Sequence, residues 1–125
     1  MSDDYDLVAE GKFCEVWLHK SAVKEVRRAP VNDRAKVTRI LEHLCEVGDE
    51  DFPDTQFKFE ARIDVGHKKV AVYVVKAFQL RIMGGWCEGT PRRFVCPEAV
   101  IKKRNQADRS QLERVAKKVG EYRGS

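Results

Sequence analysis

The sequence of 125 residues has no long hydrophobic run. Its longest uninterrupted apolar stretch extends from Val70 to Val75, far short of the roughly 20 residues that cross a bilayer as a helix. The first residues are acidic and polar, without the basic and then apolar order of a secretory signal. These features predict a cytoplasmic protein with no membrane partner. A chain of this length can bury a core without a disulfide or a metal, so one domain is expected.

Cysteine and histidine are scarce and scattered. The four cysteines form no C-x-x-C pair, and none of the three histidines stands at ligand spacing from them. We therefore expect reduced, mostly buried thiols and no metal site. The sequence also lacks a glycine-rich phosphate loop, a nucleophile elbow and a pair of carboxylates at catalytic spacing. No motif of these kinds predicts a cofactor.

Charge is unevenly distributed along the chain. The formal net charge is +4, yet the charged side chains of residues 1–10 are all acidic. We expect residues 1–10 to form a flexible acidic arm, followed by a single domain over residues 11–125. Residues 92–123 are strongly basic, with ten Lys and Arg against four acids. A basic surface of this kind suits a polyanionic partner.

The hydrophobic period changes from helical to alternating and back again along the chain. In order, the predicted elements are strand 13–18, helices 21–29 and 32–47, strands 57–65, 69–77, 78–83 and 94–96, and helix 108–122. This order predicts an α+β fold. In that fold, an N-terminal strand precedes a helical hairpin that crosses one face of a sheet, and a C-terminal helix completes the domain.

Candidate phosphate ligands lie in one predicted strand and in the basic segment after it. Arg81 stands between two apolar residues, so its side chain points to the opposite face, where it could bind phosphate oxygens or form a charged rim. The consecutive cations Lys102, Lys103 and Arg104 repel one another unless a polyanion neutralises them, although a solvated loop would also accommodate them. The other candidate RNA contacts are Arg92, Arg93, Arg109 and Lys118.

Tyr122 ends the apolar stripe of the last predicted helix. It could be a core aromatic with its hydroxyl at the edge, or it could stack on a base or exchange a proton with a nucleotide. The spacing of His19, His43 and His67 does not assemble the histidine pair that many ribonucleases use. A metal-free ribonuclease could use lysine, arginine and tyrosine instead, because crowded cations shift a lysine pKa toward that of a usable base.

Three features of the chain resemble the RelE/HigB-like toxins of bacterial toxin–antitoxin systems, in the phage-derived branch of the RelE/ParE superfamily. The first is a strand followed by two helices, from residue 13 onward. The second is the strand FQLRI, with its leucine-x-arginine pattern. The third is the apolar strand FVCPEAVIKK, which runs into two lysines before a last helix.

The resemblance implies that the N-terminal strand and helical hairpin pack on a small twisted antiparallel sheet. It also implies a metal-independent endoribonuclease that cleaves mRNA, on the ribosome or off it, through 2′-OH attack on the adjacent phosphate. It further implies a cognate antitoxin protein that inhibits the enzyme. By the same resemblance, Arg81 would contact the scissile phosphate, Lys102 and Lys103 would hold RNA or stabilise the transition state, and Tyr122 would serve as acid, base or stacking partner. Arg93 would assist. Two alternatives remain: a non-catalytic toxin-like module that acts on gyrase or another protein, and a phage-derived RNA-binding protein.

Overall fold

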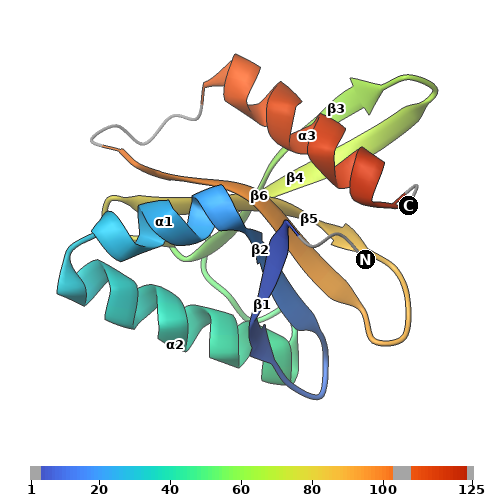
Figure 1. Ribbon diagram of the computed structural model, residues 1–125. Helices are drawn as coiled ribbons and strands as arrows, with labels where there is room; N and C mark the ends of the chain where they lie inside the picture. Colours follow the sequence, from blue (N-terminus) through green and yellow to red (C-terminus); the bar gives the residue numbers. More distant parts are fainter. Residues whose placement is uncertain (1–3, 103–107, 124–125) are drawn as a thin grey trace.

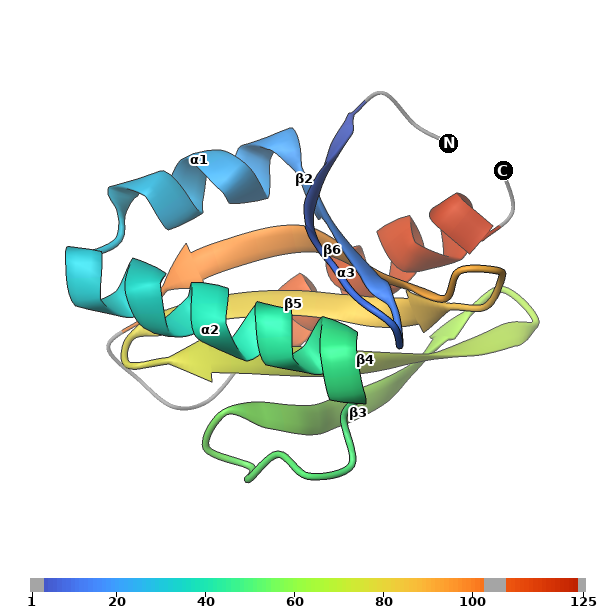
Figure 2. The same ribbon diagram turned by 90° about the horizontal axis from the view of Figure 1, so that it is seen from below.

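The computed structural model describes residues 4–102 and 108–123, over which the chain forms a six-stranded sheet between two layers of helices (Figures 1 and 2). The elements are β1 (Tyr5–Glu10), β2 (Glu15–His19), α1 (Lys20–Arg28), α2 (Val31–Val47), β3 (Phe57–Val65), β4 (Lys68–Ala77), β5 (Leu80–Cys87), β6 (Arg93–Ile101) and α3 (Arg109–Arg123). The strand order is β1-β2-β6-β5-β4-β3. Strands β2 and β6 are parallel, and the other neighbouring pairs are antiparallel.

The predicted small antiparallel sheet with a helical hairpin packed on it is wrong. The sheet is mixed and has six strands, because β2 pairs in parallel with β6, which lies far along the sequence. Helices α1 and α2 do lie on one face, but each packs on the sheet itself, α1 mainly over β6 and α2 mainly over β4. Hydrophobic periodicity indicates which residues are buried, whereas it does not specify which strands pair.

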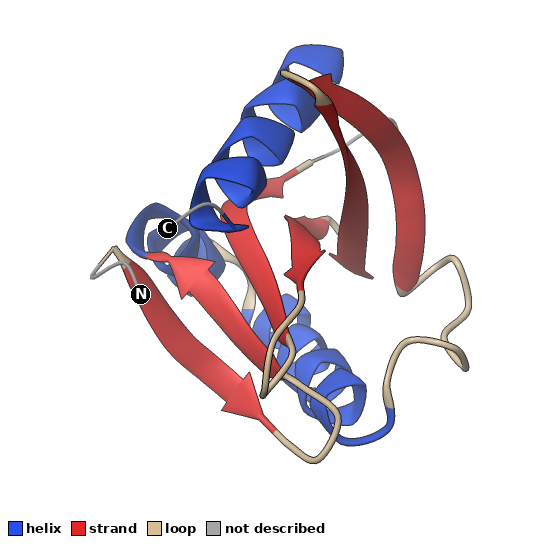
Figure 3. Ribbon diagram, turned by 90° about the vertical axis from the view of Figure 1, so that its right-hand side faces the viewer, coloured by secondary structure: helices blue, strands red, loops and turns tan. Residues whose placement is uncertain are grey.

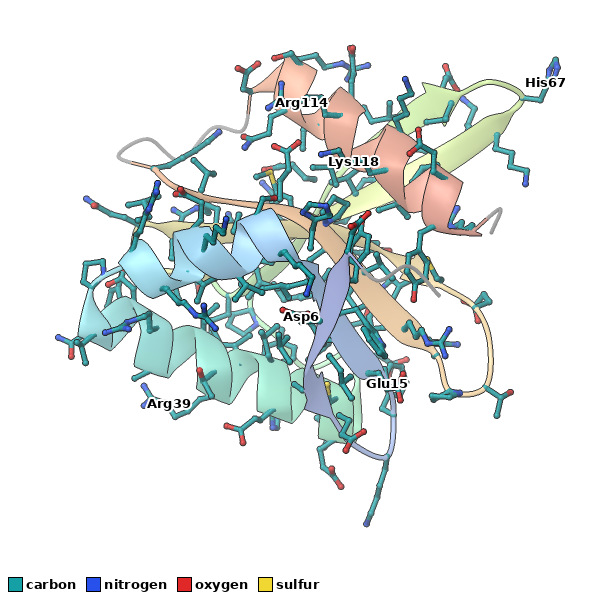
Figure 4. All side chains as sticks on the ribbon, in the orientation of Figure 1. Asp6, Glu15, Arg39, His67, Arg114 and Lys118 are labelled. Carbon is teal, nitrogen blue, oxygen red and sulfur yellow. The ribbon has the colours of Figure 1, made fainter. Side chains whose placement is uncertain are left out.

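Within the predicted acidic arm, residues 5–10 form the edge strand β1. Strand β1 pairs with β2 along its length. Two contacts with Lys20 add to this pairing: its Nζ lies 2.9 Å from the Asp6 carboxylate, and its backbone N–H donates to Asp4 O at 2.8 Å. Asp6 is labelled in Figure 4. Acidic composition therefore did not prevent strand formation, because β2 supplies a hydrogen-bonded ladder and Lys20, at the start of α1, supplies a cation.

The core is divided by the sheet into two parts. One part lies between the sheet and helices α1 and α2, with Leu44, Ile82 and Phe94 among its fully or almost fully buried side chains. The other lies beneath α3, which covers the opposite face (Figure 3). The predicted apolar stripe of α3 is confirmed, since its members Leu112, Val115, Ala116 and Val119 are all buried. The sheet therefore needs apolar side chains on both faces.

Strand β5 continues through two glycines that the sequence suggests would end it. A Cβ atom on Gly84 would lie 2.4 Å from Val95 O on β6, and one on Gly85 would lie 2.9 Å from Val119 Cγ1 on α3. Neither position has room for a side chain. The glycines permit β5 to approach β6 and α3 closely, and the strand continues to Cys87.

The start of α3 has the sequence pattern Asp108-x-x-Gln111, which resembles a capping box, but only its first residue acts as a cap. The Asp108 carboxylate accepts hydrogen bonds from the Ser110 backbone N–H at 3.0 Å and from its hydroxyl at 2.9 Å, as an N-cap residue does. Gln111 does not complete a capping box. Its Nε2 instead donates to Glu98 Oε1 on β6 at 3.4 Å, so the residue helps to fix α3 on the sheet.

The four cysteines are free and buried, which confirms the expectation of reduced, interior thiols. Burial raises the pKa of the Cys87 and Cys96 thiols above the ordinary value, which keeps them protonated. Among the helices of the described residues, none combines the length and apolar character needed to cross a membrane.

Candidate functional site

Arg81 and Lys102 lie at the same end of the sheet. Arg81 is on β5, and the backbone N–H of Lys102, just after β6, donates to Gln79 O at 2.8 Å. Arg81 is only 9% exposed, and its Nη1 donates to the carbonyl oxygens of Phe78 and, at 3.1 Å, Leu80. Burial lowers the pKa of Arg81, and the nearby carboxylates offset part of that shift. The guanidinium thus stabilises the β4–β5 turn.

The remaining predicted RNA contacts at this end of the sheet belong to the basic segment that follows β6. Arg109 begins α3 and pairs with Glu113 at 3.3 Å, with both side chains largely exposed. Hydrogen bonds from Ser110 lower the pKa of Asp108, and the positive charge of Lys102 lowers it further. Lys102 therefore lies near the start of α3. Lys103 and Arg104 lie outside the described residues.

Tyr122 lies at the other end of α3 from Asp108. The helix has 15 residues, which at about 1.5 Å per residue separates its two ends by roughly 20 Å. The structure therefore does not bring Tyr122 together with Arg81 and Lys102. Sequence reasoning grouped these residues because they come from neighbouring elements, but the length of the helix carries Tyr122 away from Lys102.

Tyr122 instead joins a group of aromatic and charged side chains where α3 ends beside β1, β2 and β6. We call this group the Arg93 cluster and define it as Tyr5, Glu15, Trp17, His19, Arg93 and Tyr122, all of them half-buried. Arg93 Nε donates to Glu15 Oε1 at 3.2 Å, and Trp17 Nε1 donates to the same oxygen at 3.0 Å. The Arg93 guanidinium carbon lies 5.9 Å from the centre of the Trp17 ring.

Strand alternation explains why these side chains share one face. Val16 and Leu18 of β2 point into the core beneath α1 and α2, so Glu15, Trp17 and His19 point the other way. Helix α3 packs on this second face mainly over β3 to β6. Figure 4 shows the labelled Glu15 at the end of β2 away from α1, where it is paired with Arg93 in the parallel register.

Two tyrosines form the aromatic side of the Arg93 cluster. The Tyr5 ring meets His19 and Tyr122 edge to face, with ring centres 5.2 and 5.3 Å apart. Burial raises the pKa of Tyr5 to about 12, with smaller contributions from nearby thiols and acids. Burial also raises the pKa of Tyr122, and the nearby Arg93 offsets part of this rise. Both phenols therefore carry their protons at neutral pH and can serve as proton donors.

The other predicted RNA contacts divide between the two faces. Arg92 points to the face opposite Arg93, where its guanidinium carbon lies 5.0 Å from the Phe13 ring centre and 5.8 Å from that of Trp86. Lys118 is half-buried on α3 (Figure 4), one helical turn before Tyr122 and on the same side of the helix. Of the predicted set, the structure therefore places Arg93 and Lys118 each near Tyr122.

Sequence reasoning gave no role in the site to four members of the Arg93 cluster: Tyr5, Glu15, Trp17 and His19. The alternation of Glu15, Trp17 and His19 with Val16 and Leu18 could have assigned them to one face of a strand. Their proximity to Arg93 could not have been found this way, because it depends on parallel pairing between distant segments.

Comparisons with known proteins identify no relative of this chain. No family model matches it, nor does any curated protein or any solved structure. The described residues also contain no group of three or more His, Cys, Asp or Glu side chains that could hold a metal ion. The class that the fold and site define is thus an α/β protein with a mixed sheet, in which carboxylate, guanidinium and phenol groups meet on one face.

The packing of Tyr5 can be tested by alkaline titration. The unfolded chain loses this phenol proton near the ordinary pKa of 10, whereas the folded protein keeps it until about pH 12. The stability contributed by the protonated phenol is therefore complete below pH 10 and decreases as the pH rises from 10 to 12. Burial raises the pKa of Tyr122 as well, so more than one tyrosine should titrate late, and the one that titrates near pH 12 should disappear in Tyr5→Phe. The variant should also lose less stability over this range. Identical titrations of the two proteins would contradict the packing.

Proposed function

We propose that this protein is a metal-independent endoribonuclease that cleaves single-stranded RNA at the Arg93 cluster. The observation that carries the proposal is that Arg93 lies against both the Glu15 carboxylate, at 3.2 Å, and the side chain of Tyr122. Cleavage by 2′-OH attack requires a base, a group that stabilises charge on the phosphate and an acid. These three side chains supply one of each on one face of the sheet.

Each group has a defined part in the proposed reaction. The Glu15 carboxylate removes the proton of the ribose 2′-hydroxyl, and the oxygen attacks the adjacent phosphorus. The bond from phosphorus to the 5′-oxygen breaks, and the Tyr122 hydroxyl donates its proton to the departing oxygen. The Arg93 guanidinium stabilises the extra negative charge on the non-bridging phosphate oxygens. The products are a 2′,3′-cyclic phosphate and a 5′-hydroxyl, and solvent restores the two protein protonation states.

Neighbouring groups support these parts. Trp17 Nε1 donates to Glu15 Oε1, which orients the carboxylate, and the rings of Trp17 and Tyr5 offer half-exposed surfaces on which bases could stack. Lys118 adds a cation on the same side of α3 as Tyr122. In this proposal Arg81 is a structural residue of the β4–β5 turn, and Lys102 binds RNA at the far end of α3.

The biological substrate and partners in the proposal come from the resemblance to RelE/HigB-like toxins. That resemblance supports mRNA as the substrate, with or without the ribosome, and a small antitoxin as the inhibitor. A toxin gene of this kind is expected beside the gene for a small DNA-binding protein. Co-expression with that neighbour should relieve the growth arrest that the enzyme causes alone.

The cleavage reaction can be tested with purified protein, a labelled single-stranded RNA and a chelator. We expect a 2′,3′-cyclic phosphate product, and we expect Glu15→Gln to lower the rate constant by roughly 10²–10⁴-fold because the variant lacks the base. Glu25→Gln is the matched control, since Glu25 pairs with Arg28 on α1, on the other face. RNA that is bound but not cut by the wild-type protein would favour the non-catalytic alternative. Unchanged cleavage by Glu15→Gln would show that the centre lies elsewhere.

A further inference from the structure

A cavity of about 280 Å³ lies beside the C-terminal half of α3, where the helix meets the β3–β4 hairpin. The tip of this hairpin is marked by His67 in Figure 4. The apolar part of the cavity is formed by Val65, Val70 and Gly120, and its polar part by Lys68, Lys117, Glu121 and Arg123. Small-molecule sites usually occupy roughly 300–1,000 Å³, so the cavity suits a ligand no larger than one nucleotide.

The cavity adjoins the Arg93 cluster through Arg123. This residue follows Tyr122 directly, and its Nε and Nη2 donate to Trp86 O at 3.1 and 2.6 Å, which fixes the guanidinium against β5. The thiol of Cys87 lies near both Arg123 and Arg93, because the positive charges of both counteract the rise in its pKa that burial causes. Cys87 also pairs with Arg93 in the β5–β6 ladder, so Arg123 and Arg93 lie on either side of this thiol and connect the cavity to the Arg93 cluster.

We propose that this cavity is a subsite for one nucleotide of the RNA substrate, next to the nucleotide whose phosphate is cut. The inference rests on the proposed function, and it names a part of the substrate site that the Arg93 cluster does not include. The base would cover the apolar floor, and its phosphate would lie between the cations of Lys68, Lys117 and Arg123. The Glu121 carboxylate can accept a hydrogen bond from an amino group of the base.

The composition of the cavity favours a nucleotide over simpler ligands. Three cations around one small opening repel one another, and an anion relieves that repulsion. Inorganic phosphate would leave the valine floor exposed to water, and an apolar ligand would leave three cations with the single carboxylate of Glu121. A nucleotide combines a flat, largely apolar base with a phosphate, so it matches both parts.

The subsite is tested by calorimetric titration of the full chain with the nucleoside monophosphates AMP, GMP, CMP and UMP, and with inorganic phosphate. We expect at least one nucleotide to bind roughly tenfold more tightly than phosphate at equal ionic strength. Lys117→Gln, which removes a cation from the rim, and Gly120→Leu, which fills the cavity, should each weaken that binding about tenfold. Lys117 is exposed, so Lys117→Gln should fold even if Gly120→Leu does not.

Lys69→Gln is the matched control for the loss of a positive charge. Lys69 follows Lys68 on β4, but it pairs with Asp64 at 3.5 Å and does not line the cavity. The control should bind nucleotide like the wild type. Phosphate binding as tight as nucleotide binding, or equal loss of affinity in Lys69→Gln and Lys117→Gln, would overturn the proposed subsite.

Kinetics separate a failure of the subsite from a failure of the proposed function. Lys117→Gln should raise the KM for RNA cleavage with little change in kcat, because the subsite binds the substrate without taking part in the reaction. If the protein cleaves RNA and the KM is unchanged in Lys117→Gln, the proposed subsite is wrong, whereas the proposed ribonuclease function is retained. If nucleotides bind in the cavity but the protein cleaves no RNA, the proposed ribonuclease function is wrong, whereas the nucleotide-binding site is retained.

Discussion

Arg93→Ala should lower the rate constant for RNA cleavage by about 10²–10³-fold, which is the usual loss when one group that stabilises the transition-state charge is removed. The wild-type guanidinium stands between the proposed base and the proposed acid, so it is placed to meet the charge that develops on the phosphate. Arg93→Lys should recover only part of the rate, because an ammonium cannot contact two phosphate oxygens in the fork geometry of arginine.

Arg92→Ala is the control that the sequence itself offers. Arg92 precedes Arg93 directly and carries the same charge, but it packs over the Phe13 and Trp86 rings on the opposite face. Its removal should leave the cleavage rate constant within a few fold of the wild type. Single-turnover cleavage of the same RNA, with circular dichroism as a check of folding, compares the two variants. Equal losses in both would indicate a general effect of positive charge and would contradict a specific role for Arg93.

Gly84→Ala should lower the free energy of unfolding by about 3 kcal/mol, the upper part of the usual range for overpacking a filled core. The added methyl group would lie 2.4 Å from Val95 O and 2.8 Å from Cys96 Sγ. Both atoms belong to β6, and a backbone oxygen cannot move aside without breaking the ladder between β5 and β6. The same change would disturb Arg93 at the start of β6, so this variant should also lose activity.

Gly120→Ala should instead raise the free energy of unfolding. Its added methyl group would lie 3.6 Å from Val65 Cγ1 and 3.9 Å from Val70 Cγ2, which are ordinary contact distances. Alanine also favours the helix over glycine by about 1 kcal/mol, so the variant should be more stable than the wild type by up to that amount. Urea unfolding of both variants measures the difference. A neutral Gly84→Ala would contradict the close approach of β5 to β6.

Local features of the fold were predictable because they depend on nearby residues. The apolar stripe of α3, its start at Asp108 and the end of α2 at Gly48 all follow from helical spacing and terminal residues. The edge strand β1 was not predictable from its acidic composition, since it depends on pairing with β2 and on the cation of Lys20. The strand that passes through Gly84 was missed because glycine usually interrupts a strand.

The candidate site was predictable only in part. The basic character of the last third of the chain pointed to a polyanion, and Arg93 and Tyr122 were among the residues it singled out. The sequence could not show that α3 carries Tyr122 roughly 20 Å from the start of the helix near Lys102. It also could not show that Arg81 donates to backbone carbonyls at a turn.

The sequence by itself determined the helical segments, most of the strands, the buried thiols and the basic character of the C-terminal region. These properties follow from local periodicity and composition, which need no knowledge of distant contacts. Only the tertiary structure decided that β2 lies parallel to β6, and this pairing brings Glu15 to Arg93. Strand pairing depends on backbone hydrogen bonds that every residue but proline can make, so side-chain pattern leaves the partner of a strand undetermined.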